Sequence, residues 1–173
     1  MKPQLPLFIS LAALSLTPAY SSTQSKPSVT GLKLAGVRVD LPAGWQAKPP
    51  PIKSAVQFAV YQDHSIFFEL VLEPKMDFSE SVDLMAWGRL VRENSAKEST
   101  LEHRKDTEVR RRTVAGRETV EYEVTGEMKG LKLHFRNIMV QSGDTFCKLV
   151  CWSVPSQWDE AQKKFDELVS HLH

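Results

Sequence analysis

The stretch LKLHFRNIMVQSGDTFCKLVCWSV, residues 131–154, decides how the rest of the chain can be arranged. Apolar and polar side chains alternate over residues 131–136, which is typical of a β-strand with one buried face and one face toward solvent. Residues 138–140 are apolar on both faces. Ser142-Gly143-Asp144 are turn residues, because glycine tolerates positive φ and aspartate bonds its own backbone. The stretch therefore predicts a β-hairpin whose second strand is residues 146–154.

A two-residue turn at Gly143-Asp144 sets the register of this hairpin. It pairs Phe135 with Trp152, Val140 with Cys147, and Ile138 with Leu149. A shift of one residue would lose the aromatic pair and move every side chain to the other face. The far end of the hairpin is then apolar on both faces, which indicates a sheet covered on both sides.

A helix is predicted after Pro155, with Ser156 as its N-cap and Asp159 in the position of a capping box. The apolar residues that follow share one helical stripe, as expected of a helix that packs on a core. They are Trp158, Ala161, Phe165, Leu168, Val169 and Leu172.

Upstream of the hairpin, residues 36–41 alternate as a strand, and residues 55–62 and 66–73 form a second hairpin about Asp63-His64. A helix is predicted from Asp77 as N-cap, with Glu80 completing a capping box, to about residue 96.

Residues 101–114 read as a polar, charge-dense strand region, and Ala115-Gly116 as a turn. Residues 119–125 alternate again, with Glu121 and Glu123 expected on the solvent side. The predicted order of elements is three strands, a helix, four strands and a helix.

The composition is that of an ordinary globular domain, with 42% hydrophobic and 25% charged residues among 173. The formal net charge of +1 gives no general argument for binding to nucleic acid or anionic membranes.

The N-terminus has the features of a signal peptide: Lys2, an apolar run over residues 5–16, and small residues before a cleavage site after Ala19 or, as a second choice, after Ser21. We therefore expect a signal peptide at 1–19, a flexible lead-in at 20–35 and a single domain at 36–173. The mature chain would be soluble, exported to the periplasm or secreted, and without a transmembrane segment.

Two cysteines in an exported chain suggest a disulfide, but Cys147 and Cys151 lie four residues apart on one predicted strand. Their Cα atoms would be about 13 Å apart, whereas a disulfide needs them within about 7 Å. We expect both to be small buried hydrophobic residues, with an intermolecular disulfide as the alternative.

The order of elements, the corner Leu41-Pro42-Ala43-Gly44-Trp45 and the terminal hairpin plus helix resemble the PsbP-like family. That family includes the extrinsic photosystem II protein PsbP, bacterial envelope proteins of the DcrB type and a eukaryotic Ran-binding relative. The resemblance covers Gly36 to Leu172. It implies an α+β fold, an α/β/α sandwich with a central antiparallel sheet of about six to seven strands and two main helices. It also implies a binding or assembly factor rather than an enzyme.

No catalytic motif supports an enzyme: the chain has no Gly-rich phosphate loop, no G-x-S-x-G elbow and no H-E-x-x-H. We expect no cofactor and no metal ligands. His171 and His173 could chelate a metal weakly, but residues at a chain terminus are usually mobile.

The main local anomaly is a basic cluster, His103-Arg104-Lys105 followed by Arg110-Arg111-Arg112, in which Arg104, Arg110 and Arg112 are the candidate site residues. Arginine forks onto carboxylates and phosphates, so these residues are candidates for a patch that docks an anionic partner. The alternative is cross-strand pairing with Glu118, Glu121 and Glu123, which would also protect a charged edge strand from aggregation.

We therefore expect a non-enzymatic binding or assembly factor of the cell envelope, with a protein partner and no nucleic acid. Two alternatives stay open. One is a small-molecule- or metal-binding domain, with or without enzymatic activity, whose site lies between sheet and helix near His134. The other is a protein that self-associates through Cys147 or Cys151.

Overall fold

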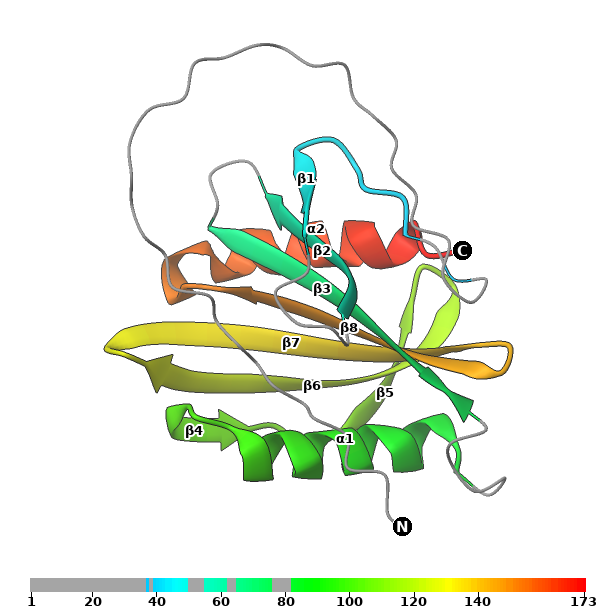
Figure 1. Ribbon diagram of the computed structural model, residues 1–173, viewed down its shortest axis with the longest axis horizontal. Helices are drawn as coiled ribbons and strands as arrows, with labels where there is room; N and C mark the ends of the chain where they lie inside the picture. The colour runs from blue at the N-terminus through cyan, green and yellow to red at the C-terminus, as the bar shows by residue number, and fades with distance from the viewer. Residues whose placement is uncertain (1–36, 38, 50–54, 62–64, 76–81) are drawn as a thin grey trace.

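The computed structural model describes residues 37, 39–49, 55–61, 65–75 and 82–173. Eight strands form one sheet in which every pair is antiparallel (Figure 1). The elements are β1 (Trp45–Lys48), β2 (Ala55–Tyr61), β3 (Ile66–Pro74), α1 (Leu84–Glu98), β4 (Glu102–Asp106), β5 (Arg110–Val114), β6 (Arg117–Met128), β7 (Leu131–Ser142), β8 (Thr145–Ser153), a 3-10 turn (Pro155–Gln157) and α2 (Trp158–Ser170). None of the helices among these residues is long and apolar enough to cross a membrane.

The strands lie side by side in the order β1-β2-β3-β8-β7-β6-β4. β5 also pairs with β6, on the same edge as β4 but nearer the start of β6. The α+β class with an antiparallel sheet is therefore confirmed, although the sheet has eight strands rather than six or seven. The additional strand arises because residues 101–114 form two short strands, β4 and β5, instead of one.

The terminal hairpin has the predicted register. Phe135 pairs with Trp152, Val140 with Cys147, and Ile138 with Leu149. The turn consists of Gly143 and Asp144, and Gly143 has the positive φ, 56°, that the turn requires. β7 and β8 lie at the centre of the sheet, so the hairpin is the element on which the other strands assemble.

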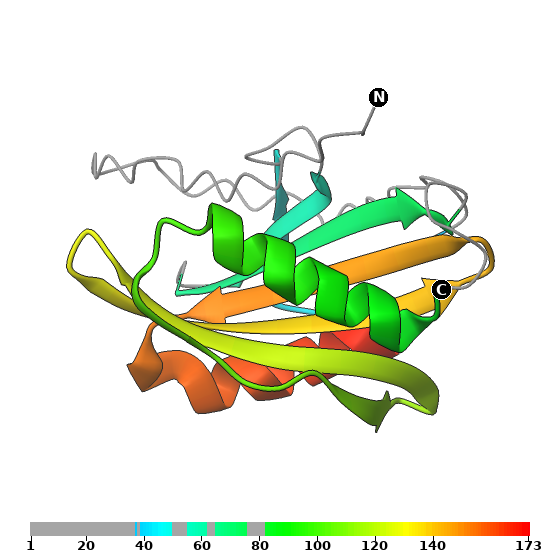
Figure 2. The same cartoon turned by 90° about the horizontal axis from the view of Figure 1, so that it is seen from below.

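Each face of the sheet has its own hydrophobic core, and each core contains one helix. α2 contributes Phe165 and Leu168 to a core that includes Ile138 of β7. α1 contributes Trp87 to a second core that includes Met139 of β7. Neighbouring residues of β7 enter different cores because successive strand side chains point to opposite faces. Figure 2 shows α1 on the near side of the sheet and α2 on the far side.

The strand predicted at 36–41 is not found in the described part of that range. Val39 forms only an isolated bridge with Leu172, beyond the end of α2. Val37 and Val39 are buried, and Val39 belongs to the α2 core. The alternation of apolar and polar residues over 36–41 therefore arises because Val37 and Val39 are buried in the α2 core, and not because this segment is a strand of the sheet. The first strand begins after the corner, where Gly44 has φ 91° and Trp45 opens β1.

Both helices begin later than predicted. α1 starts at Leu84, and Asp83 is its N-cap, accepting a hydrogen bond from the backbone N–H of Ala86 at 2.7 Å. The predicted cap Asp77 and its partner Glu80 lie outside the described residues. α2 starts at Trp158 after the 3-10 turn, and Gln157 rather than Ser156 occupies the N-cap without a side-chain hydrogen bond. Proline at the start of that turn favours the tighter helix there.

The predicted signal peptide at 1–19 and lead-in at 20–35 also lie outside the described residues, as does the turn at Asp63-His64. The paired strands β2 and β3 on either side of that turn confirm the second hairpin.

Candidate functional site

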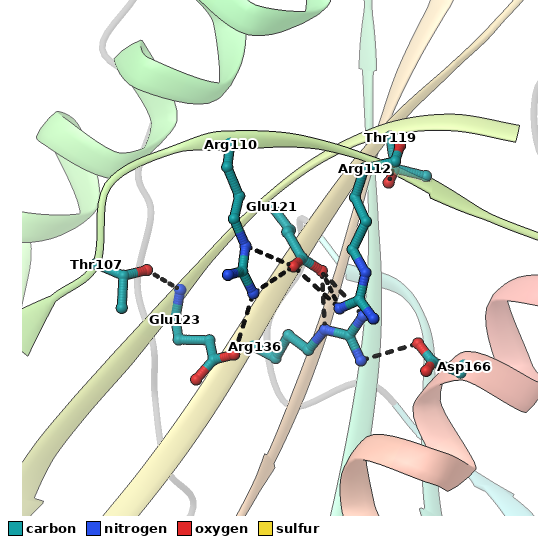
Figure 3. Close-up of polar contacts among 8 residues, drawn as sticks. All are labelled: Thr107, Arg110, Arg112, Thr119, Glu121, Glu123, Arg136 and Asp166. Carbon is teal, nitrogen blue, oxygen red and sulfur yellow. Dashed lines mark hydrogen bonds and ion pairs between the residues drawn. The ribbon is translucent and has the colours of Figure 1, made fainter.

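Three arginines from two strands converge on one carboxylate. Glu121 of β6 accepts hydrogen bonds from Arg110 Nε to Oε1 at 2.9 Å and from Arg112 Nη1 to Oε1 at 3.2 Å. Arg136 of β7 approaches from the other side and donates from Nε and Nη2 to Oε2, at 3.1 and 2.9 Å. Figure 3 shows all three guanidinium groups directed at this carboxylate. We call Arg110, Arg112, Arg136 and Glu121 the arginine cluster.

The register of the strands builds this cluster. Arg110 pairs directly with Glu121 across β5 and β6, and Arg112 is the next residue of β5 on the same face. Arg136 pairs with Glu123, one step along the same face of β6, so its long side chain reaches back to Glu121. Glu123 itself lies 3.8 Å from Arg110.

Helix α2 closes the cluster from its own side of the sheet. Asp166 Oδ1 forms an ion pair with Arg136 Nη1 at 2.9 Å, and the Arg136 guanidinium lies over the ring of Phe165. The guanidinium group of Arg136 is therefore paired with two carboxylates, Glu121 and Asp166. These pairs compensate the cost of burying a charged side chain that is only 2% exposed.

The cluster keeps Glu121 charged although it is fully buried. Burial alone would raise the pKa of Glu121. The charge of Arg136 and hydrogen bonds from Arg136, Arg110 and Arg112 outweigh that effect and hold the pKa below its ordinary value. The carboxylate therefore stays ionised at neutral pH, beneath the arginines.

Arg110 and Arg112 remain open to solvent even though their positions are held. Their side chains are 61% and 45% exposed, and the carboxylate that they share is not exposed at all. Arg111, between them, points to the other face of the sheet, where it pairs with Glu118 and lies 3.8 Å from Asp83. β5 thus presents arginine on both faces.

The predicted site residues are only partly brought together. Arg110 and Arg112 lie in one cluster, and the ion pairs that we considered as the alternative, to Glu118, Glu121 and Glu123, are present. Arg104 lies elsewhere. It extends from β4 toward α1, donates to Asp106 at 2.7 and 2.8 Å and to the backbone oxygen of Ser95 at 3.0 Å, and is 11% exposed.

Glu121 and Arg136 were both expected on a solvent face, and the structure corrects this. Alternation alone misleads here, because the polar face of β6 and β7 is covered by the arginines of β5 and by α2. One signal was available: the turn at Ala115-Gly116 fixes a hairpin register that places Arg110 opposite Glu121.

A second group of buried polar residues lies on the α1 face and was not anticipated. Lys148 of β8 is 6% exposed, and Glu69 and Glu73 of β3 are 8% and 7% exposed. Glu73 accepts a hydrogen bond from Trp87 Nε1 at 3.0 Å. Glu69 Oε1 is buried without a hydrogen-bond partner. Burial raises the pKa of Glu69, which the charge of Lys148 only partly offsets.

The remaining candidates from the sequence, two cysteines and three histidines, are buried or contact neighbouring parts of the fold. Cys147 and Cys151 are buried free thiols, as expected. The ring of His134 packs against that of Trp158 with 4.5 Å between centroids. His171 contacts the backbone oxygen of Glu167, and His173 lies 3.9 Å from Asp40. Among the described residues, no group of three or more histidine, cysteine, aspartate or glutamate side chains is placed to hold a metal ion.

Comparison with known proteins places the chain by family and fold. A family model described as "Serine/threonine kinase C-terminal domain" matches residues 33–172. A search of curated proteins finds no match.

Several solved structures share the fold at low sequence identity. Cyanobacterial PsbP from Synechocystis sp. is 11% identical with a TM-score of 0.59, covering 80% of this chain and 86% of its own. LpqN of Mycobacterium tuberculosis, described as involved in cell envelope biogenesis, is 10% identical with a TM-score of 0.55 over 79% and 81%. The Ran-binding protein Mog1p of Saccharomyces cerevisiae is 10% identical with a TM-score of 0.56 over 84% and 96%. The PsbP-like resemblance is therefore confirmed at the level of the fold.

Proposed function

The chain belongs to the serine/threonine kinase C-terminal domain family, and from this membership and the arginine cluster we propose that it is a non-enzymatic binding domain of the cell envelope. Its partner would be a protein that docks on the surface of β5. Residues 36–173 would form a single PsbP-like domain, with the two helices and the sheet as the layers of an α/β/α sandwich. Residues 1–19 would direct its export.

One observation carries the binding role: Arg110 and Arg112 are exposed, yet fixed by a carboxylate that is itself buried. A surface arginine normally loses side-chain freedom when it binds. Arg110 and Arg112 have already lost much of that freedom to Glu121, so less entropy remains to be lost on docking. An arginine fork also suits the planar carboxylates of a protein partner.

The relatives are consistent with this proposal. The family description names a C-terminal domain of serine/threonine kinases, and this sequence has no Gly-rich phosphate loop that would indicate kinase chemistry. Mog1p binds Ran and LpqN is involved in envelope biogenesis, so the same fold serves binding and envelope roles in other proteins.

Crosslinking in the producing cells, followed by affinity capture and mass spectrometry, tests the proposal. The variant is Arg110→Gln, which keeps the hydrogen bonds from Arg112 and Arg136 to Glu121. Glutamate at position 110 would instead place a second carboxylate beside Glu121. Arg89→Gln, at an exposed position on α1, is the matched control. We expect a partner captured equally by the wild type and Arg89→Gln, and at least about tenfold less by Arg110→Gln, as for the loss of an interface arginine. Equal capture by all three proteins would show that the partner binds at a surface other than β5.

A second candidate function is the binding of a small molecule between sheet and α1. The unpartnered Glu69 Oε1 favours it, since a buried polar atom without a partner is rare in a folded protein. A thermal-shift screen of small polar compounds would test it. A compound that stabilises the wild type but not Glu69→Gln supports this function, and a screen without such a compound rejects it.

A further inference from the structure

β5 has an open edge. One of its edges pairs with β6 over all of its residues, from Arg110 opposite Glu121 to Val114 opposite Arg117. Among the described residues, no strand pairs with its other edge, and β5 borders the sheet (Figure 1). An edge of this kind exposes backbone donors and acceptors that can pair with another chain.

The turn of the hairpin shows which backbone groups face outward. Ala115 and Gly116 both have positive φ, 49° and 78°, as in a type I′ turn. The residues that flank a two-residue turn, Val114 and Arg117, form a hydrogen-bonded pair, and such pairs alternate along an antiparallel ladder. Because the register has no shift, Arg110, Arg112 and Val114 direct their backbone groups at β6. The N–H and C=O groups of Arg111 and Thr113 therefore point out of the sheet.

The side chains along this edge are cationic on both faces. Arg110 and Arg112 lie on the α2 side, and Arg111, 55% exposed, lies on the α1 side. A strand added beside β5 would alternate in the same way, so three consecutive side chains of that strand would meet these three arginines in turn.

We propose that the open edge of β5 binds an extended protein segment that carries consecutive acidic residues, as an additional strand of the sheet. This inference rests on the proposed function and adds to it the chemistry of the partner and its mode of binding. Backbone hydrogen bonds to Arg111 and Thr113 hold the segment, and the arginines select its side chains. The same arginines disfavour a basic strand, because like charges placed opposite each other across a strand pair repel.

The probe for the test is a fluorescein-labelled peptide with Glu-Glu-Glu between Val-Thr and Thr-Val, and binding to the full chain is read by fluorescence polarisation. Thr113→Pro removes one outward N–H without touching the ladder to β6, since proline is tolerated where the N–H faces solvent. Thr113→Val keeps the N–H and is the matched control. We expect Thr113→Pro to bind the peptide at least about fivefold more weakly, as for a lost hydrogen bond, and Thr113→Val to bind like the wild type.

Two further peptides make the result independent of how the proline variant folds. The same peptide with lysine for glutamate should not bind, and one N-methylated at alternate amides should lose binding to the wild type. Peptide binding that is unaffected by N-methylation, or the absence of binding to the wild type, overturns strand addition. A cellular partner lost in Arg110→Gln but retained in Thr113→Pro would leave the docking surface in place and reject only the added strand. A partner retained in both would reject the proposed surface itself.

Discussion

The Glu121 carboxylate of β6 lies 2.9 Å from Nη2 of Arg136 of β7, and the two side chains are 0% and 2% exposed. Removing two charges from water costs free energy, which is recovered only when good geometry and further hydrogen bonds satisfy both groups. Arg110 and Arg112 supply those bonds to Glu121, and Asp166 supplies an ion pair to Arg136. The exposed arginines of β5 therefore depend on a buried pair for their positions.

Glu121→Gln should destabilise the protein strongly. The amide cannot neutralise three guanidinium groups, and breaking a buried ion pair typically costs about 3–5 kcal/mol. Urea unfolding monitored by tryptophan fluorescence measures the loss. Glu123→Gln is the control, because its carboxylate is 25% exposed and 3.8 Å from Arg110, so about 1 kcal/mol or less is expected. Equal losses in the two variants would contradict the special role of Glu121.

The stabilisation by Glu121 should depend on pH in the acidic range. Its pKa is lower in the folded protein than the ordinary value of 4.5, so between those two values the unfolded chain binds more protons. The contribution of Glu121 is thus complete above the ordinary pKa and is lost as the pH falls through the folded-state pKa. Urea unfolding from about pH 7 down to about pH 3 should show the gap between the wild type and Glu121→Gln shrinking on the acidic side. A gap that stays constant over this range would show that Glu121 does not titrate with a lowered pKa.

Local sequence was sufficient for the centre of the fold. The register of β7 and β8 follows from a two-residue turn and one aromatic pair, Phe135 and Trp152, and it is confirmed. The pairing of Arg110 with Glu121 follows by the same reasoning from the turn at Ala115-Gly116. Hairpins can be predicted from sequence because the signals that define them, turn residues and alternation, lie within a few residues of one another.

What sequence reasoning missed depends on contacts between distant segments. The burial of Glu121 requires the arginines of β5 above it, and the burial of Arg136 requires Asp166, thirty residues away on α2. Val39 alternates like a strand residue but bridges to Leu172 near the C-terminus. Helix α1 begins at Leu84 with Asp83 as its N-cap, whereas the capping-box pattern predicted a start at Asp77. Such outcomes are decided by tertiary packing, which a local pattern does not contain.

Gly88→Ala should weaken the packing of α1 on the sheet. A Cβ at this position would lie 2.8 Å from Val120 Cγ1 and 3.1 Å from Met139 Cε. Alanine gains up to about 1 kcal/mol of helix propensity, whereas overpacking costs about 1–3 kcal/mol. We expect a net loss in the free energy of unfolding of about 1 kcal/mol. In a Val120→Ala background the 2.8 Å contact is gone and mainly the flexible end of Met139 must shift, so the loss caused by Gly88→Ala should be smaller. A loss that is the same with and without Val120 would place the cause outside this contact.

The two thiols of β8 should be unreactive in the folded protein. Cys147 and Cys151 are fully buried and unpaired, and burial raises the pKa of Cys147 to about 12 and that of Cys151 further. Since the thiolate is the reactive form, iodoacetamide at about pH 8 should label the native protein at least about a hundredfold more slowly than the urea-unfolded chain. Mass spectrometry during the reaction counts the labels, and the unfolded sample controls for the reagent. Because neither sulfur reaches the surface, a non-reducing gel after oxidation should also show only monomer. Rapid labelling of the native protein, or a dimer that thiols reverse, would mean that β8 opens and would restore self-association through these cysteines as a possible role.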